Sequence, residues 1–469
     1  MSRSTVVVVG AGIAGLAAAW ELLQHNEFHV IVVEAAGQPG GKLCTAEVAG
    51  RRIDVGAESM LARRPEALQL VAEAGLAAGV VHPRLPAAVY SRGRLHPLPP
   101  RTLMGIPSDP GSAAGVLTSD EVARARAERP GRPVPDEVSD VSVGDLVADR
   151  LGDAVVDRLV EPLLAGVYAG HAREISLRAA VPGLWAAVRS GASITEAAAA
   201  VPLSSHAGPV FAGWVGGLGE LVTGLTVALT AGGVDVRTGS TMRELTRTPT
   251  GWRLVTGPTT HVTAMEADGV VLAVPAAPTA RLLRPHAPAA AGLLADIAYA
   301  SVAIVTLAVP RSGASRLVGS GFLVPPVEGL TIKAATFSSA KWKWVDALDD
   351  DMVLLRASLG RAGEAAVLQR DDADLVAVAV GDLRTVLGPD LPDPVDAHVQ
   401  RWGGALPQYA VGHLDRVAAI LERVAAQPAL GVAGAAYQGV GIPACVASGR
   451  AAAREVAAQV RTRAAALRQ

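Results

Sequence analysis

One glycine-rich turn near the beginning of the chain limits the fold more than any other feature. Gly10, Gly12 and Gly15 stand in the spacing GxGxxG, between a run of valines ending the stretch 5–9 and an alanine- and leucine-rich stretch at 16–24. A continuous β-branched run is typical of a strand that is buried on both faces of a parallel sheet. The stretch after the turn predicts a helix, so the pattern indicates a strand, a tight turn and a helix in succession.

A second strand and an acidic residue complete this unit. Residues 29–33 are again largely β-branched and apolar, and Glu34 follows them directly. This order is typical of a dinucleotide-binding β-α-β unit, in which the second glycine lets the backbone approach a pyrophosphate. We therefore expect Glu34 to bind ribose hydroxyls, and an acid at this position disfavours the 2′-phosphate of NADP. A glycine turn without a ligand is the alternative.

Length and charge exclude several classes of protein. A chain of 469 residues is too long for one ordinary core, so we expect two or three domains. A formal net charge of −2 and an aromatic content of 3% argue against nucleic-acid binding. The two cysteines, Cys44 and Cys445, and the ten histidines show no metal-ligand spacing, so neither a metal site nor a disulfide is expected.

The apolar runs are too short for a membrane protein of the helical type. No run reaches the roughly 18 apolar residues that a membrane-spanning helix needs, and no cleavable signal precedes the first strand. We therefore expect a cytoplasmic protein without a transmembrane segment. Peripheral contact with the inner face of a membrane stays open.

The remaining chain alternates between helical and strand-like segments. Residues 97–142 are rich in Pro, Gly, Asp and Arg and indicate loops and short helices, whereas 143–200 follows a helical pattern. Alternation and β-branched content predict strands at 234–238, 242–247, 252–256, 270–275 and 430–433, and mostly strand at 297–309 and 322–359. Helices are predicted after the glycine loop 213–219, at 363–387 and at 444–465.

A second glycine pair distinguishes between the dinucleotides. Gly40 and Gly41 precede Lys42, and the sequence DVGAE follows at 54–58. This arrangement resembles the extended FAD fingerprint of flavin amine oxidases, and an ordinary turn after a strand is the alternative. The late loop at 434–443 leads into the last predicted helix and looks like a second FAD contact of that group, where backbone N–H groups face the cofactor.

Six segments together resemble the porphyrinogen oxidases of haem biosynthesis, a group within the flavin amine oxidase superfamily. They are DVGAESMLARRPEA (54–67), EPLLAGVYAG (161–170), SLRAAVPGL (176–184), GWVGGLGEL (213–221), RWGGALPQYAVGHL (401–414) and GAAYQGVGIPACVASG (434–449). The resemblance extends over essentially the whole chain.

The resemblance implies an α/β fold with three parts. A discontinuous Rossmann-type FAD-binding domain would comprise 1–58, 213–282 and 428–469, and a mixed-sheet substrate-binding domain 59–105 and 283–427. A helical insertion would occupy 106–212. In membrane-bound relatives this region carries an apolar membrane-facing surface, but here charges interrupt it.

The same resemblance implies an activity. It is the oxidation of a porphyrinogen to a porphyrin by non-covalently bound FAD, in three two-electron steps, with O₂ as acceptor and hydrogen peroxide as product. We expect coproporphyrinogen III as the substrate, because relatives of the soluble, Gram-positive type use it. Protoporphyrinogen IX is the alternative, and a flavin amine oxidase, a carotenoid desaturase or a non-catalytic flavin-binding protein are weaker ones. A ferrochelatase is a candidate recipient of the product by pathway logic alone.

The resemblance also assigns roles to individual residues. Arg64, beside Arg63, would bind a propionate, with solvated surface arginines as the alternative. Gly166 and Tyr168 would line the substrate cavity, and core packing is the alternative for Tyr168 and for Trp402. No catalytic side chain is expected, because the flavin supplies the chemistry. The family often has an arginine where Lys42 stands, which replaces a bidentate contact by a point charge. The expected cofactor contacts are Gly10, Gly12, Ile13, Ala14, Gly15, Glu34, Gly41, Lys42, Gly56, Ala57, Glu58, Ser59, Val236, Trp402, Gly434, Gly441, Ile442 and Pro443.

Overall fold

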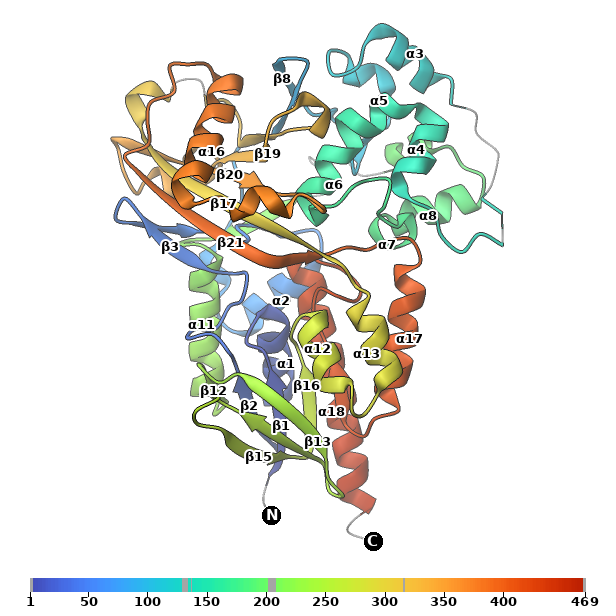
Figure 1. Ribbon diagram of the computed structural model, residues 1–469, viewed down its shortest axis with the longest axis vertical. Coiled ribbons are helices and arrows are strands. Elements are labelled where there is room, and N and C mark those ends of the chain that lie inside the picture. The colour runs from blue at the N-terminus through green and yellow to red at the C-terminus, as the bar shows by residue number, and fades with distance from the viewer. Residues whose placement is uncertain (1–2, 129–133, 136, 201–207, 315–316, 467–469) are drawn as a thin grey trace.

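A parallel five-stranded sheet forms the base of the molecule (Figure 1). The computed structural model describes every residue except 1–2, 129–133, 136, 201–207, 315–316 and 467–469. The sheet has the order β12-β2-β1-β16-β22, and all these neighbours pair in parallel. Its strands are β1 (Ser4–Val9), β2 (Phe28–Val33), β12 (Asp235–Arg237), β16 (Gly269–Leu272) and β22 (Leu430–Val432).

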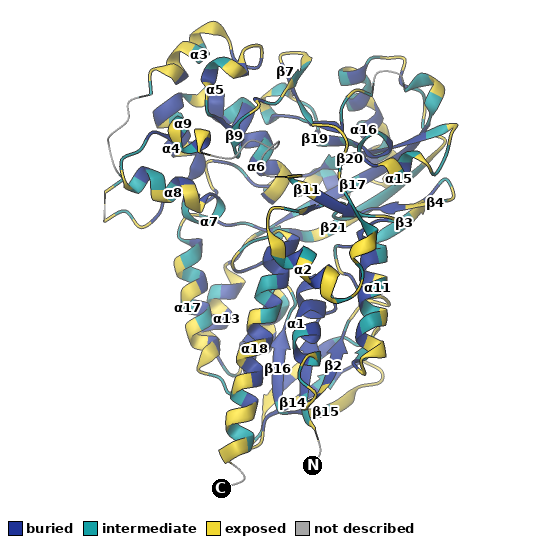
Figure 2. Cartoon of the chain, turned by 180° about the vertical axis from the view of Figure 1, so that it is seen from behind, coloured by how far each residue is buried: buried dark blue, intermediate teal, exposed yellow. Residues whose placement is uncertain are grey.

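Both faces of this sheet are covered, which explains the continuous valine runs. One face packs on α1 (Ile13–Leu23), α11 (Leu218–Ala231) and α18 (Ile442–Ala466). The other face packs on α12 (Ala276–Leu283), α13 (Pro288–Ala295), α17 (His413–Ala425) and a three-stranded sheet of β13 (Met242–Arg247), β14 (Trp252–Thr256) and β15 (Thr263–Ala267). In Figure 2 the parallel strands are buried, whereas the outer sides of α11 and α17 are exposed.

A seven-stranded mixed sheet lies above the parallel sheet in Figure 1. Its order is β21-β17-β20-β19-β18-β7-β8, with only β18 and β7 parallel to each other among these neighbours. The strands are β7 (Ala88–Ser91), β8 (Arg94–Pro97), β17 (Tyr299–Pro310), β18 (Gly321–Leu323), β19 (Ile332–Phe337), β20 (Met352–Leu359) and β21 (Asp396–Pro407). Helix α16 (Asp372–Leu387) buries its apolar side against one face.

Short elements connect the two sheets. β3 (Thr45–Val48) pairs with β4 (Arg51–Asp54), and β11 (Phe211–Trp214) lies between β5 (Met60–Leu61) and β6 (Val80–Val81). Helix α2 (Pro65–Glu73) packs on α18. Two short helices, α14 (Ser338–Lys341) and α15 (Lys343–Asp346), interrupt the region that the sequence predicts as mostly strand.

The third part of the fold is helical. It contains α3 (Ser119–Arg126), α4 (Val143–Leu151), α5 (Asp153–Val155), a π-helical turn η3 (Val156–Val160), α6 (Glu161–Tyr168), α7 (Leu177–Ala180), α8 (Pro182–Arg189) and α9 (Ile194–Ala199), with the small hairpin β9 (Thr102–Leu103) and β10 (Ile106–Pro107). These helices share one apolar core. Among the described residues, no helix combines the length and the apolarity that crossing a bilayer requires.

The predicted fold class, an α/β protein with a Rossmann-type sheet, a mixed sheet and a helical part, is confirmed. The division into sequence ranges stays a prediction, and parts of 97–142 and of the 106–212 insertion lie outside the described residues. The packing refines one range, because α13 and α17 lie against the parallel sheet although the sequence assigned 283–427 to the other domain. Helices α12, α13 and α17 were not anticipated.

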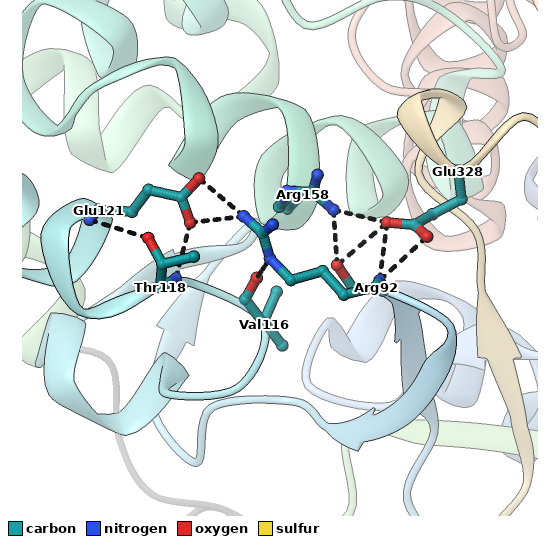
Figure 3. Close-up of polar contacts among 7 residues, drawn as sticks. Arg92, Val116, Thr118, Glu121, Arg158 and Glu328 are labelled. Carbon is teal, nitrogen blue, oxygen red and sulfur yellow. Dashed lines mark hydrogen bonds and ion pairs between the residues drawn. The ribbon is translucent and has the colours of Figure 1, made fainter.

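A partly buried carboxylate connects the helical part to the mixed sheet (Figure 3). Glu328, at the end of the 3-10 turn Pro326–Glu328, accepts a bond from Nη1 of Arg158 at 2.5 Å and from the backbone N–H of Arg92 at 3.0 Å. The hydroxyl of Ser91 donates to it at 3.2 Å, and Arg158 also donates to that hydroxyl at 2.9 Å. The backbone of Arg92 has φ of +53°, and its guanidinium donates a hydrogen bond to the carboxylate of Glu121 in α3. The Glu328 carboxylate therefore joins β7, η3 and the turn after β18, and the Arg92 side chain extends the network to Glu121 of α3.

We expect Glu328→Gln to lower the free energy of unfolding by about 1–3 kcal/mol, because it leaves the partly buried Arg158 without a counter-charge. Burial raises the pKa of Glu328, but the Arg92 backbone and Arg158 outweigh burial, and the net pKa is lowered. Thermal or denaturant unfolding measures the effect. Glu121→Gln is the matched control at a more exposed pair, with an expected loss of about 1 kcal/mol or less. Equal losses in the two variants would contradict the assignment.

Candidate active site

The glycine turn after β1 contains two glycines that serve packing. Gly10 has φ of +103°, and a Cβ on it would lie 2.6 Å from the carbonyl oxygen of Ala273. A Cβ on Gly15 would overlap the carbonyl oxygen of Gly10. These positions require glycine because the turn is tight and α1 approaches it closely. Ile13 and Ala14 lie buried in the first turn of α1.

Gly12 differs, because no heavy atom lies within 4 Å of a Cβ built on it. It is the N-cap residue of α1, and no side chain caps this helix end. Gly40 donates its N–H to the carbonyl of Ala11 at 2.8 Å, which places the second glycine pair beside the first. A Cβ on Gly41 would lie 3.5 Å from the Gly12 Cα. The open helix end with two adjacent glycine backbones suits a pyrophosphate.

Glu34 lies at the carboxyl end of β2, at the edge of this open site. Its carboxylate accepts the N–H of Ala11 at 2.7 Å and the N–H of Ala36 at 2.8 Å. Val236 is on the neighbouring strand β12, paired with Val32. The carboxylate is thereby fixed beside the glycine turn, where a ribose next to the pyrophosphate would lie.

Glu34→Ala is expected to raise the dissociation constant for FAD about ten- to a hundredfold, because it removes ribose acceptors and frees two backbone donors. Titration of apoprotein with FAD, followed by flavin fluorescence, measures this. Glu34→Gln, which keeps one acceptor oxygen, should lose less. Unchanged affinity in the alanine variant would contradict the ribose contact.

The loop before α18 supplies a second open stretch of backbone. Gly434 has φ of +123° with no heavy atom within 4 Å of a Cβ, and Gly441 has only the Pro443 Cδ at 3.9 Å. A Cβ on Gly449 of α18 would overlap the carbonyl oxygen of Ala14. The two helices therefore cross in backbone contact close to the start of α1. Ile442 and Pro443 are buried in the first turn of α18.

The segment after β4 joins this region to the mixed sheet. Ala57 donates its N–H to the Lys42 carbonyl at 3.0 Å, and a Cβ on Gly56 would overlap that same oxygen. Trp402 of β21 donates its indole N–H to the Val55 carbonyl at 3.0 Å. Burial lowers the pKa of Lys42, with Cys445 of α18 acting in the opposite direction. Lys42, Gly56 and Trp402 thus lie together, as predicted for neighbours of one cofactor, although their contact with FAD stays a prediction.

Two cations of the mixed-sheet region bind the side chain of Glu58. This carboxylate forms an ion pair with Lys341 and another with Arg356, whose Nη1 lies 2.7 Å away. Arg356 also donates to the Gly56 carbonyl at 2.5 Å. Burial raises the pKa of Glu58, but Lys341 and then Arg356 outweigh it and lower the pKa to about 2. Glu58 is therefore an anion that ties this loop to the mixed sheet, and Ser59 follows it, partly buried.

A buried aspartate on the same segment anchors α11. Asp54 accepts the N–H groups of Leu218 at 2.9 Å and of Gly219 at 3.3 Å, at the start of that helix. Burial raises the pKa of Asp54 to about 7. This capping explains why the glycine loop 213–219 precedes a helix.

Of the predicted substrate residues, Arg64 and Tyr168 lie near the loop before α18, whereas Gly166 lies beside Leu323 of the mixed sheet. Arg64 is exposed and pairs with Glu66 at 2.5 Å, while a Cβ on Gly439 would lie 4.0 Å from its Nη1. Tyr168 is buried, with its ring centroid 5.5 Å from that of Tyr409, and burial raises its pKa to about 12. Gly166 is exposed on α6.

Tyr409 connects these parts, and sequence reasoning did not single it out. Its hydroxyl donates to the Ala435 carbonyl at 2.6 Å and accepts the Gly439 N–H at 2.7 Å. Lys341 and Arg356 were missed as well. Arg356 stands inside the apolar run MVLLRASL, and a lone charge within a buried strand is the signal that could have identified it.

Comparison with known proteins identifies the family. The sequence model of the flavin-containing amine oxidoreductase family matches residues 13–457 of this chain. The chain belongs to this family. It is therefore a flavin-dependent oxidoreductase, and the open glycine backbones of Gly12, Gly434 and Gly441 fit FAD.

Several relatives resemble the flavoenzyme over almost its full length. A coproporphyrinogen III oxidase of Mycobacterium tuberculosis is 42% identical over 96% of this chain and 97% of its own. A coproporphyrinogen III oxidase of Bacillus subtilis is 30% identical over 96% and 97%. A chloroplastic protoporphyrinogen oxidase of Oryza sativa is 30% identical over 92% and 82%.

Solved structures give the same result. An Exiguobacterium protein assigned as a protoporphyrinogen oxidase superimposes with a TM-score of 0.85 at 30% identity, over 97% of this chain and 99% of that one. The cyclohexylamine oxidase of Brevibacterium oxydans shares the fold, with a TM-score of 0.70 at 18% identity over 98% and 100%.

Proposed function

We propose that this flavoenzyme oxidises coproporphyrinogen III to coproporphyrin III, with O₂ as acceptor and hydrogen peroxide as product. The observation that carries the proposal is the 42% identity to relatives of that name over nearly the whole of both chains. In the same proposal the enzyme acts in the cytoplasm, and a ferrochelatase-type protein receives the product. Protoporphyrinogen IX is the second candidate, because the chloroplastic protoporphyrinogen oxidase of Oryza sativa is 30% identical to this chain.

The residues of the chain hold and orient both reactants in this proposal. FAD, when bound, would supply the redox chemistry between the macrocycle and O₂. Gly12 and the start of α1 would bind the pyrophosphate, and Glu34 would bind the ribose. The Glu58–Arg356 pair fixes the Gly56 carbonyl and so the loop against the mixed sheet. Because FAD supplies the redox chemistry, the protein contributes position and a water-poor environment.

Anaerobic mixing tests the proposal directly. Without O₂, coproporphyrinogen III should reduce the bound flavin by two electrons, seen as loss of its visible absorbance. Porphyrin fluorescence should rise only after O₂ is admitted, because the porphyrin requires three such two-electron steps. A flavin that stays oxidised with both coproporphyrinogen III and protoporphyrinogen IX would contradict the proposal. Reduction by a simple amine instead would favour the amine oxidase alternative.

Arg64→Ala is expected to raise KM for coproporphyrinogen III about tenfold with a smaller change in kcat. The reason is that a charge-assisted bond to a propionate is lost, while the flavin site is unchanged. Steady-state fluorescence assays measure both constants. Arg454→Ala on α18 is a control, since this arginine is also exposed and ion-paired. Unchanged KM in Arg64→Ala would remove Arg64 from the substrate site.

A further inference from the structure

Two buried cations that the account above does not use, Lys333 and Arg361, lie in β19 and just after β20 of the mixed sheet. One face of this sheet, with Leu355, Ala357 and Leu359 of β20, is covered by α16. Arg356 lies between these residues in β20 and reaches Glu58 and Gly56, so its face looks toward the FAD-binding part. Ser358 follows two positions later on the same face.

This face remains partly accessible although its strands are central in the sheet. Ala334 pairs with Ser358, and Thr336 pairs with Arg356. Ala334, Thr336 and Ser358 are all only partly buried. Leu323 of β18 pairs with Ala334. A Cβ on the exposed Gly166 of α6 would lie 3.6 Å from Cδ2 of Leu323. The accessible stretch therefore continues from the Glu58 end to the wall formed by α6.

Two buried cations lie at the end of this stretch that is farther from Glu58. Lys333 is 5% exposed and sits where the register between β19 and β20 shifts. Its ammonium donates to the Gly360 carbonyl at 2.6 Å. Arg361, which follows Gly360 in the chain, is 3% exposed, and its Nη2 donates to the Val324 carbonyl at 3.2 Å. The N–H of Ala362 bonds to the Ala169 carbonyl at 2.7 Å, which holds this pair against the end of α6.

The charges of this pair are not balanced. Glu364 lies 3.4 Å from Arg361, and its side chain is 40% exposed. Among the described residues no carboxylate forms an ion pair with Lys333, and Nε of Arg361 has no acceptor. Burial and then Arg361 lower the pKa of Lys333 to about 7. Two buried cations beside one half-exposed carboxylate are unfavourable, and either loss of the Lys333 proton or the approach of an anion relieves the cost.

We propose that Lys333 and Arg361 form a carboxylate-binding pair that takes one propionate arm of the porphyrinogen. An ammonium has three donors and a guanidinium five, so both retain donors after their backbone bonds. With the flavin contacts at the Glu58 end, this pair lies at the opposite end of the accessible face. A macrocycle between them would direct one carboxylate arm to the pair and a ring carbon toward the flavin.

This inference rests on the proposed function and adds a specificity residue to it. A substrate with four propionates presents an arm to this pair in more orientations than one with two propionates. The pair therefore favours coproporphyrinogen III over protoporphyrinogen IX. Arg64 would serve another arm, near the loop before α18.

Lys333→Gln separates substrate binding from a purely structural role. The glutamine amide still donates to the Gly360 carbonyl, but the positive charge is gone. Binding of two probes to the holoenzyme is followed by porphyrin fluorescence, namely coproporphyrin III and its uncharged tetramethyl ester. We expect affinity for the acid to fall at least about tenfold and affinity for the ester to change less than about twofold. KM for coproporphyrinogen III should rise in parallel, with kcat changed much less.

Controls decide between the outcomes. Lys343→Gln makes the same change at an exposed lysine and should leave both affinities unchanged. Lys333→Arg keeps the charge and should retain most of the preference for the acid. If Lys333→Gln fails to fold or to bind FAD, Arg361→Gln tests the same pair with the same expectation.

Two results would overturn the inference. One is wild-type affinity of Lys333→Gln for coproporphyrin III, and the other is an equal loss for the acid and the ester. A wild-type enzyme that oxidises neither porphyrinogen would instead overturn the proposed function. The two failures are therefore distinguishable.

Discussion

A Gly12→Val variant should fold and purify without flavin. The backbone of Gly12 is extended, with φ of −70° and ψ of 173°, which valine adopts without strain. No protein atom lies within 4 Å of the new Cβ, so the fold has room for the side chain. The pyrophosphate needs this same space, and an isopropyl group there would exclude it. We expect FAD affinity to fall by at least about a hundredfold, or about 2.7 kcal/mol.

The measurement is the flavin content of purified protein, with circular dichroism as the check on folding. Gly292→Val is the matched control, because a Cβ on Gly292 of α13 also meets nothing within 4 Å. That helix position is remote from the cofactor, so the control should keep a full complement of FAD. Stoichiometric flavin in Gly12→Val would show that the pyrophosphate does not lie at the start of α1.

Glu58→Gln is expected to lower the free energy of unfolding at pH 7 by about 3–5 kcal/mol. It leaves Arg356 and Lys341 without their common counter-charge, and their side chains are only 7% and 15% exposed. Glutamine still accepts one hydrogen bond, so the loss reflects charge more than shape. Denaturant unfolding of the holoenzyme measures it. Glu422→Gln, at an 81% exposed carboxylate, should lose less than about 1 kcal/mol.

The lowered pKa of Glu58 determines how the stability difference between wild type and Glu58→Gln changes with pH. The pKa of Glu58 is about 2 in the folded protein, below the ordinary glutamate value of 4.5. The folded state therefore binds fewer protons, and the pair stabilises it fully above about pH 4.5. This contribution is lost as the pH falls from about 4.5 toward 2. The difference in stability between wild type and Glu58→Gln should shrink over that interval. A difference independent of pH would contradict the ion pair.

The sequence alone predicted those parts of the fold and site in which the contacting residues are close together in the chain. The turn at Gly12 and the acid at Glu34 belong to one unit of about thirty residues, so spacing alone indicated a nucleotide site. The valine run of 5–9 predicted a strand buried on both faces, and helices cover both faces. The family resemblance extended this to the loop before α18, and the family itself is confirmed.

Long-range pairs explain what the sequence did not reveal. Arg356 contacts Glu58 across 298 positions, and no local pattern records such a partner. Glu58 was predicted as a cofactor contact, and the structure adds that it is held by two cations. Tyr168 was predicted to line the cavity, and its burial against Tyr409 shows that packing also determines its position. Lys333 stood unnoticed in a strand-like region, because its lack of a carboxylate partner appears only in three dimensions.

The most direct test of the account is a parallel assay of the purified flavoenzyme with coproporphyrinogen III and protoporphyrinogen IX under air. Porphyrin fluorescence and hydrogen peroxide are followed together. We predict a kcat/KM at least about tenfold higher for coproporphyrinogen III, since the sites proposed at Arg64 and Lys333 bind carboxylates. Three peroxides should form for each porphyrin, as six electrons require. A higher kcat/KM for protoporphyrinogen IX, or flavin-loaded enzyme inactive on both, would contradict the account.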